Sequence, residues 1–251
     1  MIPTPIQSAL ATLQQFEVPA LLIGGQACIL YGGAEFSRDL DLLIAAPESS
    51  LPSLGSALGD LAAELIAVPP LRAELLLRGH AVHFRCRRAD CDGLRIDVMT
   101  NPPRLADLAA AWRRRVTFRL PMGEVPVVAL PDLVATKKTQ RDKDWATIGE
   151  LVEADIVAYR DSAVPTRVTF WLEESREVET LWRLVRAFPE LAETAELGRP
   201  LLAVAKQGDR ARLEMALAEE QIRGKAADRE YWAPIQAELE QLRHELRRTS
   251  R

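Results

Sequence analysis

The hydrophobic and polar positions of the first fifty residues predict helices alternating with strands. Apolar side chains recur at helical spacing over residues 4 to 16, and leucines recur three and four apart over residues 49 to 66. The short apolar runs PALLIGG, residues 19–25, and DLDLLIA, residues 39–45, are typical of buried strands. Between them, QACILYGG predicts a short helix that glycine closes.

The middle of the chain predicts two hairpins and two helices. Two strand-like runs around an Asp-Gly turn predict a hairpin from His80 to Thr100. VTFRL and VPVVAL, within residues 116–130, predict a second hairpin around PMGE, and a helix is expected from about Pro103 to Arg115. Residues 130–152 open with proline and aspartate and continue apolar at helical spacing, which predicts one helix.

The last third of the chain is almost wholly helical in pattern. In the final helix the apolar residues step by three and four positions, a stripe that we attribute to internal packing and that consists of Trp232, Ile235, Leu239, Leu242 and Leu246. The predicted fold is therefore α/β (α+β), with a mixed β-sheet flanked by helices. We expect one domain over residues 1–160 and a helical C-terminal region over residues 161–251.

Composition points to an ordinary globular protein, with 48% hydrophobic and 27% charged residues. No apolar run reaches the ~18 residues of a membrane span, and the N-terminus has no basic start followed by an apolar stretch. The three cysteines do not suggest a disulfide framework. We therefore expect a cytoplasmic protein with no membrane partner.

Charge is unevenly spread along the chain. The formal net charge of −4 argues against a basic coat for non-specific nucleic-acid binding. Between Leu71 and Arg119, however, there are eleven arginines and five acidic residues. This stretch forms either solvated strand and helix faces or a surface that attracts phosphates.

Two aspartates stand one residue apart inside an apolar run. Side chains alternate along a strand, so Asp39 and Asp41 point to the same face. Like charges this close require a cation, and oxygen ligands favour Mg²⁺ or Mn²⁺. If the strand containing Asp97 lies alongside, three carboxylates converge and can hold two divalent ions roughly 3.5–4 Å apart. Alternatively, the aspartates lie at a solvated strand end.

Gly24 and Gly25 follow a predicted strand and precede a predicted helix. Exposed backbone N–H groups at such a place can bind a phosphate. Glycine also simply permits a tight turn, and no Gly-Lys-Ser/Thr follows, so this is not a P-loop.

Together these motifs resemble the nucleotidyltransferase superfamily typified by DNA polymerase β. The chain has LLIGG, thirteen intervening residues, DLDLLI, and later RIDVM. Within the superfamily, GGQACILYGG, SRDLDLLI and KKTQRDKDW resemble the AbiEii-like bacterial nucleotidyltransferases, a group that includes toxins of toxin–antitoxin pairs. The motifs cover residues 20 to 145, and the resemblance implies a nucleotidyltransferase-type sheet.

The resemblance implies a role for each motif residue. Gly24 and Gly25 would contact the triphosphate of a bound NTP. Asp39 and Asp41 would bind both metal ions. Asp97 would ligate the metal nearer the acceptor and help to deprotonate the acceptor hydroxyl.

A second implied group lies in KKTQRDKDW. Lys137 or Lys138, Arg141 and Asp144 match a Lys…Arg…Asp helix motif that faces the active site in AbiEii-like proteins, and on one helix Lys137, Arg141 and Asp144 would share a face. The alternative is a surface of exposed salt bridges.

The sequence also departs from the pattern of these relatives. They often carry a basic residue four positions before the first aspartate, where this chain has Glu35. Arg38 either compensates as a nucleotide-binding residue or is unrelated.

A zinc site is a weaker alternative elsewhere. His80, His83, Cys86 and Cys91 are close in sequence, but the two histidines would face opposite sides of a strand and the cysteines straddle a turn. Ordinary strand positions explain them better.

The predicted function is Mg²⁺-dependent transfer of a nucleoside monophosphate from an NTP to an acceptor hydroxyl on RNA, protein or a small molecule. A toxin that is paired with an antitoxin is one kind of enzyme with this predicted activity. The alternative is a catalytically inactive nucleotide- or partner-binding module on the same scaffold.

Overall fold

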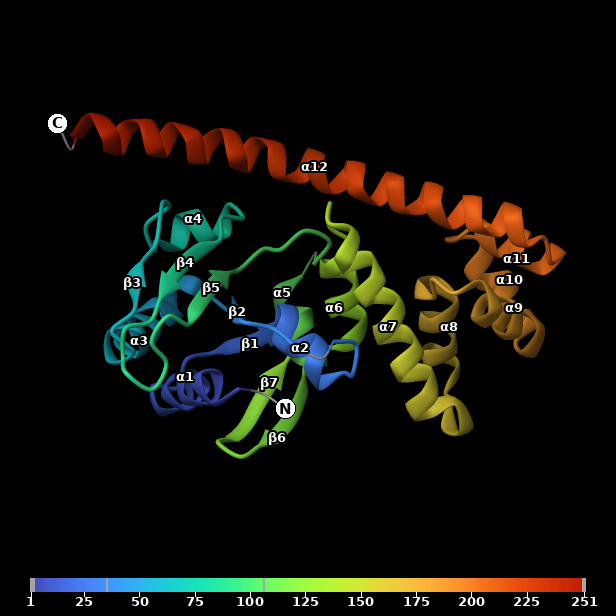
Figure 1. Ribbon diagram of the computed structural model, residues 1–251, viewed down its shortest axis with the longest axis horizontal. Coiled ribbons are helices and arrows are strands. Elements are labelled where there is room, and N and C mark those ends of the chain that lie inside the picture. The colour runs from blue at the N-terminus through green and yellow to red at the C-terminus, as the bar shows by residue number, and fades with distance from the viewer. Residues whose placement is uncertain (1–2, 35, 106, 250–251) are drawn as a thin grey trace. The chain divides into compact units, whose positions relative to one another are not determined.

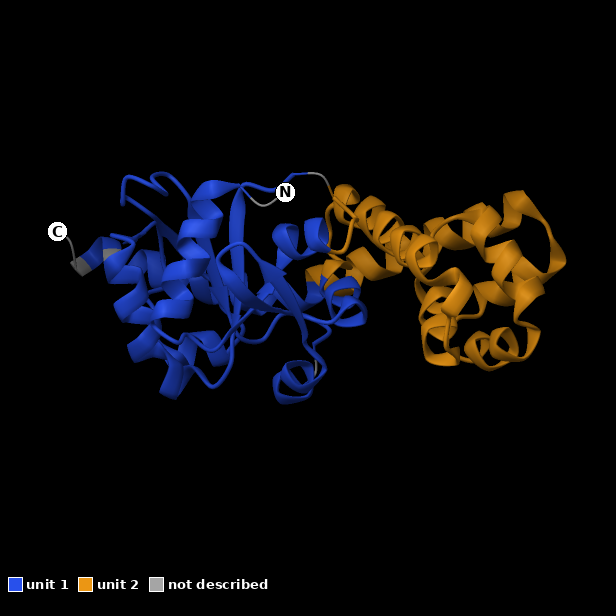
Figure 2. Ribbon diagram, turned by 90° about the horizontal axis from the view of Figure 1, so that it is seen from below, with its two compact units in different colours: residues 1–30, 35–136, 230–251 blue, residues 31–34, 137–229 orange. Residues whose placement is uncertain are grey.

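A computed structural model describes residues 3–34, 36–105 and 107–249 of the chain. The chain forms two compact units (Figure 2). Unit 1 contains residues 1–30, 35–136 and 230–251, and unit 2 contains residues 31–34 and 137–229. The boundary between the units at residues 136 and 137 does not coincide with the domain boundary expected at residue 160. Each unit is described by itself below.

Unit 1 is built on a mixed β-sheet, as predicted. In the described part of the chain, seven strands pair in the order β3-β4-β5-β2-β1-β7-β6 (Figure 1). Neighbours β2 and β5, and β1 and β7, are parallel, and the other pairs are antiparallel. The strands are β1 (Ala20–Ile23), β2 (Asp39–Ile44), β3 (Glu64–Leu65), β4 (Val82–Arg85), β5 (Arg95–Met99), β6 (Val116–Leu120) and β7 (Gly123–Val127).

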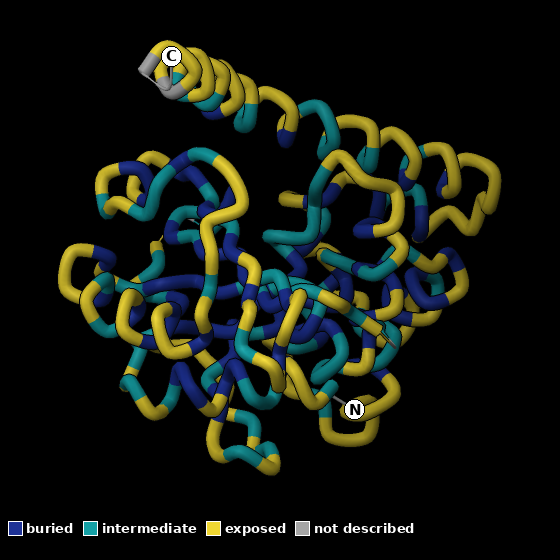
Figure 3. Tube along the Cα trace, turned by 60° about the vertical axis from the view of Figure 1, so that its left-hand side comes forward, coloured by how far each residue is buried: buried dark blue, intermediate teal, exposed yellow. Residues whose placement is uncertain are grey.

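Both predicted hairpins are present, as β4–β5 and β6–β7. The apolar residues of the central strands β1 and β2 are buried in the core of unit 1 (Figure 3). The helices up to the unit boundary are α1 (Thr4–Gln15), α2 (Gly24–Leu30), α3 (Pro47–Asp60), α4 (Ala73–Leu77), α5 (Leu108–Arg114) and α6 (Leu130–Lys137).

Two predicted helices are shorter than expected. The helix expected over 49–66 ends at Asp60, and Ala62 takes a left-handed conformation with φ of 47° before the short strand β3. The helix expected from Pro103 begins at Leu108, because the side chain of Asp107 accepts a hydrogen bond from the backbone N–H of Ala110 over 3.0 Å and caps it there.

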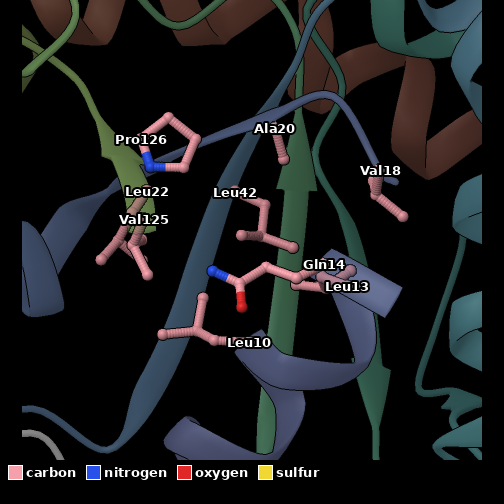
Figure 4. Close-up of a pocket in the computed structure, with 9 residues that line it drawn as sticks. All are labelled: Leu10, Leu13, Gln14, Val18, Ala20, Leu22, Leu42, Val125 and Pro126. Atoms are coloured by element: carbon pink, nitrogen blue, oxygen red, sulfur yellow. The ribbon is translucent and has the colours of Figure 1, made fainter. Parts of the chain in front are cut away.

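Helix α1 covers one face of the sheet. Its side chains Leu10 and Leu13 lie against Leu22 of β1, Leu42 of β2 and Val125 of β7, around a cavity of about 40 Å³ (Figure 4). A gap this small is a packing defect of the core. Because neighbouring side chains on β2 alternate, the residues on either side of Leu42 face away from α1.

Unit 2 is almost wholly helical, as predicted. Trp171 is the largest fully buried side chain among its described residues, and its indole N–H donates to Oδ2 of Asp155 over 2.7 Å. The remaining elements are α7 (Asp142–Tyr159), the 3₁₀ turn Arg160–Ser162, α8 (Pro165–Glu174), α9 (Val178–Ala187), α10 (Pro189–Glu196), α11 (Leu201–Gln207) and α12 (Arg210–Thr249), of which unit 2 holds residues 210–229.

The last part of α12 belongs to unit 1. There Tyr231 donates its hydroxyl hydrogen to the backbone carbonyl of Asn101 over 2.7 Å, and Glu238 pairs with Arg78 over 2.6 Å and with His80 over 2.8 Å. Of the expected packing stripe, Ile235 is buried, and Trp232, Leu239 and Leu242 are half-buried. Among the described residues, none of the helices is long and apolar enough for a membrane span.

Candidate active site

The three predicted aspartates lie on one face of the sheet. Leu40 and Leu42 are buried on the α1 side of β2, and Asp39 and Asp41 therefore point to the other side. Strand β5 runs parallel to β2 with Asp97 directly opposite Asp41. Directly paired residues share a face, so the expected proximity of these strands is confirmed. We call this side of the sheet, with its three carboxylates, the aspartate face.

Two rows of directly paired residues run across this face. His83 of β4 is opposite Asp97, which gives the row His83, Asp97 and Asp41 across three strands. Two residues along, Arg85 is opposite Arg95, and Arg95 is opposite Asp39. The aspartate face therefore carries a histidine and two arginines beside its carboxylates.

Arg95 is the cation that the paired aspartates required. Its Nε donates to Oδ1 of Asp97 over 2.7 Å. That hydrogen bond raises the pKa of Arg95 against the effect of burial, and the negative charges of Asp97, Asp39 and Asp41 raise it further. The sequence carried a signal for this contact that we did not use: Arg95 precedes Asp97 by two positions on one strand.

Asp97 is held from two sides. Nδ1 of His83 lies 2.8 Å from its Oδ1 and donates to it, since an ionised carboxylate has no hydrogen to give. Burial would raise the pKa of Asp97, but the hydrogen bonds from His83 and Arg95 outweigh it and hold that pKa below its ordinary value. Asp97 is therefore a stable anion at neutral pH.

The Gly-Gly turn is shaped by Asp41. Gly24 has a φ of +66°, and a Cβ there would lie 1.9 Å from Oδ2 of Asp41. The backbone N–H of Gly25 donates to the same oxygen over 3.3 Å, and a Cβ on Gly25 would collide with Ser37. Both glycines are thus required by close approach, and their contact with a triphosphate stays a prediction.

In this conformation the side chains are not arranged to hold the pair of divalent ions that the resemblance implies. Oδ1 of Asp97 already accepts hydrogen bonds from Arg95 and His83. Within residues 3–34, 36–105 and 107–249, no three side chains of histidine, cysteine, aspartate or glutamate are grouped to hold a metal ion. In this conformation Arg95 supplies the positive charge at the aspartates.

The residues just before Asp39 are exposed. The guanidinium of Arg38 lies 5.6 Å from the centre of the Phe36 ring, which is itself largely exposed. Glu35 lies outside the described residues. Nucleotide binding by Arg38 stays a prediction.

The second predicted group is brought together by a turn and not by one helix. The chain leaves the helix after Lys137 and re-enters it at Asp142, so the expectation of a single helix over 130–152 is wrong. Asp144 is nonetheless the centre of the group, because its carboxylate accepts from Thr139, from Nε of Arg141 over 2.7 Å and from Nζ of Lys137 over 3.4 Å. All four of these residues belong to unit 2, and Asp144 is buried there.

Asp144 is expected to stabilise unit 2 in a pH-dependent way. Burial would raise its pKa, but Lys137, Thr139 and Arg141 lower it below the ordinary value. We expect Asp144→Asn to reduce the free energy of unfolding by about 1.5–3 kcal/mol at pH 7, as measured by urea denaturation. Because the folded pKa is lowered, this difference should be complete above the unfolded pKa of about 3.9 and should shrink as the pH falls through the folded value. A difference that is absent at pH 7 would contradict a structural role.

The candidate zinc residues have other contacts. His80 is fully buried and its Nε2 lies 2.8 Å from Glu238. Cys86 and Cys91 are buried free thiols, and burial together with Cys91 raises the pKa of Cys86 to about 12. A thiol with so high a pKa is a poor source of thiolate.

The arginine-rich stretch is largely neutralised within the protein. Arg115 lies over the ring of Trp112 at 5.0 Å. Other arginines of the stretch form ion pairs with acidic side chains. The pairs are Arg72–Glu74, Arg78–Glu238, Arg87–Glu64, Arg88–Asp90, Arg95–Asp97, Arg113–Asp107, Arg114–Asp132 and Arg119–Glu124. Solvated faces with internal pairing therefore explain most of this stretch.

No protein-family model matches the sequence, and no curated protein matches it. Among solved structures, the chain is similar to an antigenic nucleotidyltransferase-like protein from Paracoccidioides brasiliensis, with 18% identity and a TM-score of 0.45, over 76% of this chain and 90% of that one. The functional conclusion below rests on the side chains of the aspartate face.

Proposed function

We propose that this protein transfers a nucleoside monophosphate from an NTP to an acceptor hydroxyl. The acceptor hydroxyl would lose its proton to solvent and its oxygen would form a bond to the α-phosphorus, the bond from that phosphorus to the bridging oxygen would break, and pyrophosphate would leave. The observation that supports this proposal is the convergence of Asp39, Asp41 and Asp97 on one face, beside the turn at Gly24 and Gly25.

The charges of the aspartate face define what its residues can do. Three carboxylates repel a triphosphate, and one arginine offsets only part of that repulsion. A requirement for Mg²⁺ is therefore part of the proposal. The lowered pKa of Asp97 makes it a weak proton acceptor, so we assign this carboxylate to holding positive charge and not to removing the acceptor proton.

One observation favours a second candidate, a nucleotide-binding module without turnover. Asp97 is occupied by Arg95 and His83, and this arrangement leaves the expected two-ion site unformed. Such a module would bind NTP and release it unchanged. Calorimetry distinguishes it from an enzyme, because heat from binding would saturate without the continuing heat of a reaction.

The direct test is incubation of the protein with each α-³²P-labelled NTP, Mg²⁺ and candidate acceptors. We expect label to move from the NTP to an RNA, protein or small-molecule fraction with release of pyrophosphate, and EDTA to stop it. Saturable NTP binding with no label transfer under any condition would replace this proposal with the binding module.

The resemblance to AbiEii-like proteins extends the proposal to a toxin of a toxin–antitoxin pair. A neighbouring gene for an antitoxin is the simplest observation that would support this extension.

A further inference from the structure

Arg85 differs from the other arginines around it. It is exposed on β4, and among the residues that the structure describes it has no hydrogen bond, ion pair or ring contact. Arg87, two positions along and also exposed, pairs with Glu64 over 2.9 Å. Arg85 is therefore available to a ligand in a way that its neighbour is not.

Arg85 has an acidic neighbour on one side in the sheet, Glu64, and a basic neighbour on the other, Arg95. It lies directly opposite Arg95 in the β4–β5 pair. Like charges directly opposite each other in a sheet are destabilising, because their Cβ atoms are only about 4.5–5.5 Å apart. Arg95 is bonded to Asp97, and Glu64 of β3, which lies opposite Arg85 on its other side, is bonded to Arg87. An anion between the two guanidinium groups would remove the repulsion.

The strand order separates this arginine pair from the Gly-Gly turn. Strand β2 lies between β1 on one side and β5, followed by β4, on the other. Gly24 and Gly25 follow β1, whereas Arg95 and Arg85 are on β5 and β4. If the phosphates of the NTP occupy the turn, the arginine pair lies across the carboxylates from them, on the side that the acceptor must approach.

We propose that Arg85 and Arg95 form a subsite for a phosphate group carried by the acceptor. Guanidinium groups bind phosphate oxygens in paired hydrogen bonds, and two of them in adjacent strands can hold one phosphate from both sides. The subsite selects acceptors that carry a phosphate near the reacting hydroxyl. Its assignment to the acceptor rests on the proposed function, whereas phosphate binding itself does not.

Arginine side-chain NMR tests phosphate binding without any activity. The Nε–Hε resonances of the full-length protein are followed during titration with inorganic phosphate in EDTA, with Arg85→Lys and Arg95→Lys used to assign the signals. We expect the signals of both arginines to shift and Arg85→Ala to weaken phosphate binding at least about fivefold. Arg119→Ala, the matched control on strand β6, where Arg119 is exposed and pairs with Glu124, should change it less than about twofold. Equal weakening by the two substitutions, or unmoved Arg85 signals, would overturn the proposal.

A second arm separates the acceptor from the nucleotide as the source of the phosphate. The titration is repeated with Mg²⁺ in place of EDTA and with ATP at saturating concentration. The proposal predicts that inorganic phosphate still shifts the Arg85 signal, because ATP leaves the subsite open. If ATP itself shifts that signal and abolishes the response to inorganic phosphate, the nucleotide occupies the subsite and the assignment to the acceptor is wrong. Either result is obtained even if no label transfer is ever detected.

Discussion

Asparagine in place of Asp39 is expected to reduce label transfer from NTP by about a hundredfold to a thousandfold. The substitution keeps the size of the side chain and removes one negative charge from the aspartate face. Asp39 is half-buried and lies directly opposite Arg95, so its charge acts where the substrate phosphates and their cation must be held. The measurement is the initial rate of label transfer at saturating NTP and Mg²⁺.

Asp92→Asn is the matched control for this substitution. Asp92 is an exposed aspartate of unit 1 in the turn between β4 and β5, and it lies away from the rows that form the aspartate face. We expect its substitution to leave the rate within about twofold. An Asp39→Asn protein that transfers label at the wild-type rate would show that the carboxylates do not serve the reaction.

Alanine in place of Arg95 is expected to strengthen Mn²⁺ binding by about a hundredfold. In the wild-type protein the guanidinium is bonded to Asp97 and its positive charge lies near Asp39 and Asp41. Its removal leaves three carboxylates on one face without that charge, and a divalent cation is the natural replacement. The free Mn²⁺ signal in electron paramagnetic resonance, recorded during titration, reports the affinity.

The control for the metal measurement is Arg87→Ala. Arg87 is an exposed arginine that pairs with Glu64 and not with an aspartate of the face. Its loss should leave Mn²⁺ affinity unchanged within about twofold. If Arg95→Ala binds Mn²⁺ no more tightly than this control, Arg95 and a metal ion do not compete for the same carboxylates.

The arrangement of the aspartates could be predicted because it follows from local rules. Alternation along a strand fixes that Asp39 and Asp41 share a face, and the apolar residues between them fix which face is buried. The proximity of Asp97 needed in addition that β5 should lie beside β2, a condition that the apolar pattern around Asp97 does not determine.

The partners of Asp97 could not be predicted because they depend on register. His83 reaches Asp97 only if the β4–β5 hairpin pairs these two residues, and a shift of one residue would turn His83 to the other face. The connection between the strands, residues 86–94, is too long for the turn type alone to set that register. Arg95 was the more accessible signal, since it shares the strand of Asp97.

The break between α6 and α7 was missed for a different reason. The segment KKTQRD contains neither glycine nor proline, and every residue in it tolerates a helix. The turn is instead held by side chains: Thr139 and Arg141 donate to Asp144, and the indole of Trp145 donates to the carbonyl of Thr139 over 2.7 Å. Such hydrogen bonds compete with the helix and have no periodic pattern in the sequence.

The most direct test of the account is a crystal structure of the protein with Mn²⁺ and a non-hydrolysable NTP analogue. We predict anomalous scattering from manganese between Asp39 and Asp41, the α-phosphate of the analogue beside it, and Arg95 moved away from Asp97. A structure in which the analogue binds elsewhere, or in which Arg95 stays on Asp97 with no manganese at the aspartates, would contradict the claim that this face of the sheet performs nucleotidyl transfer.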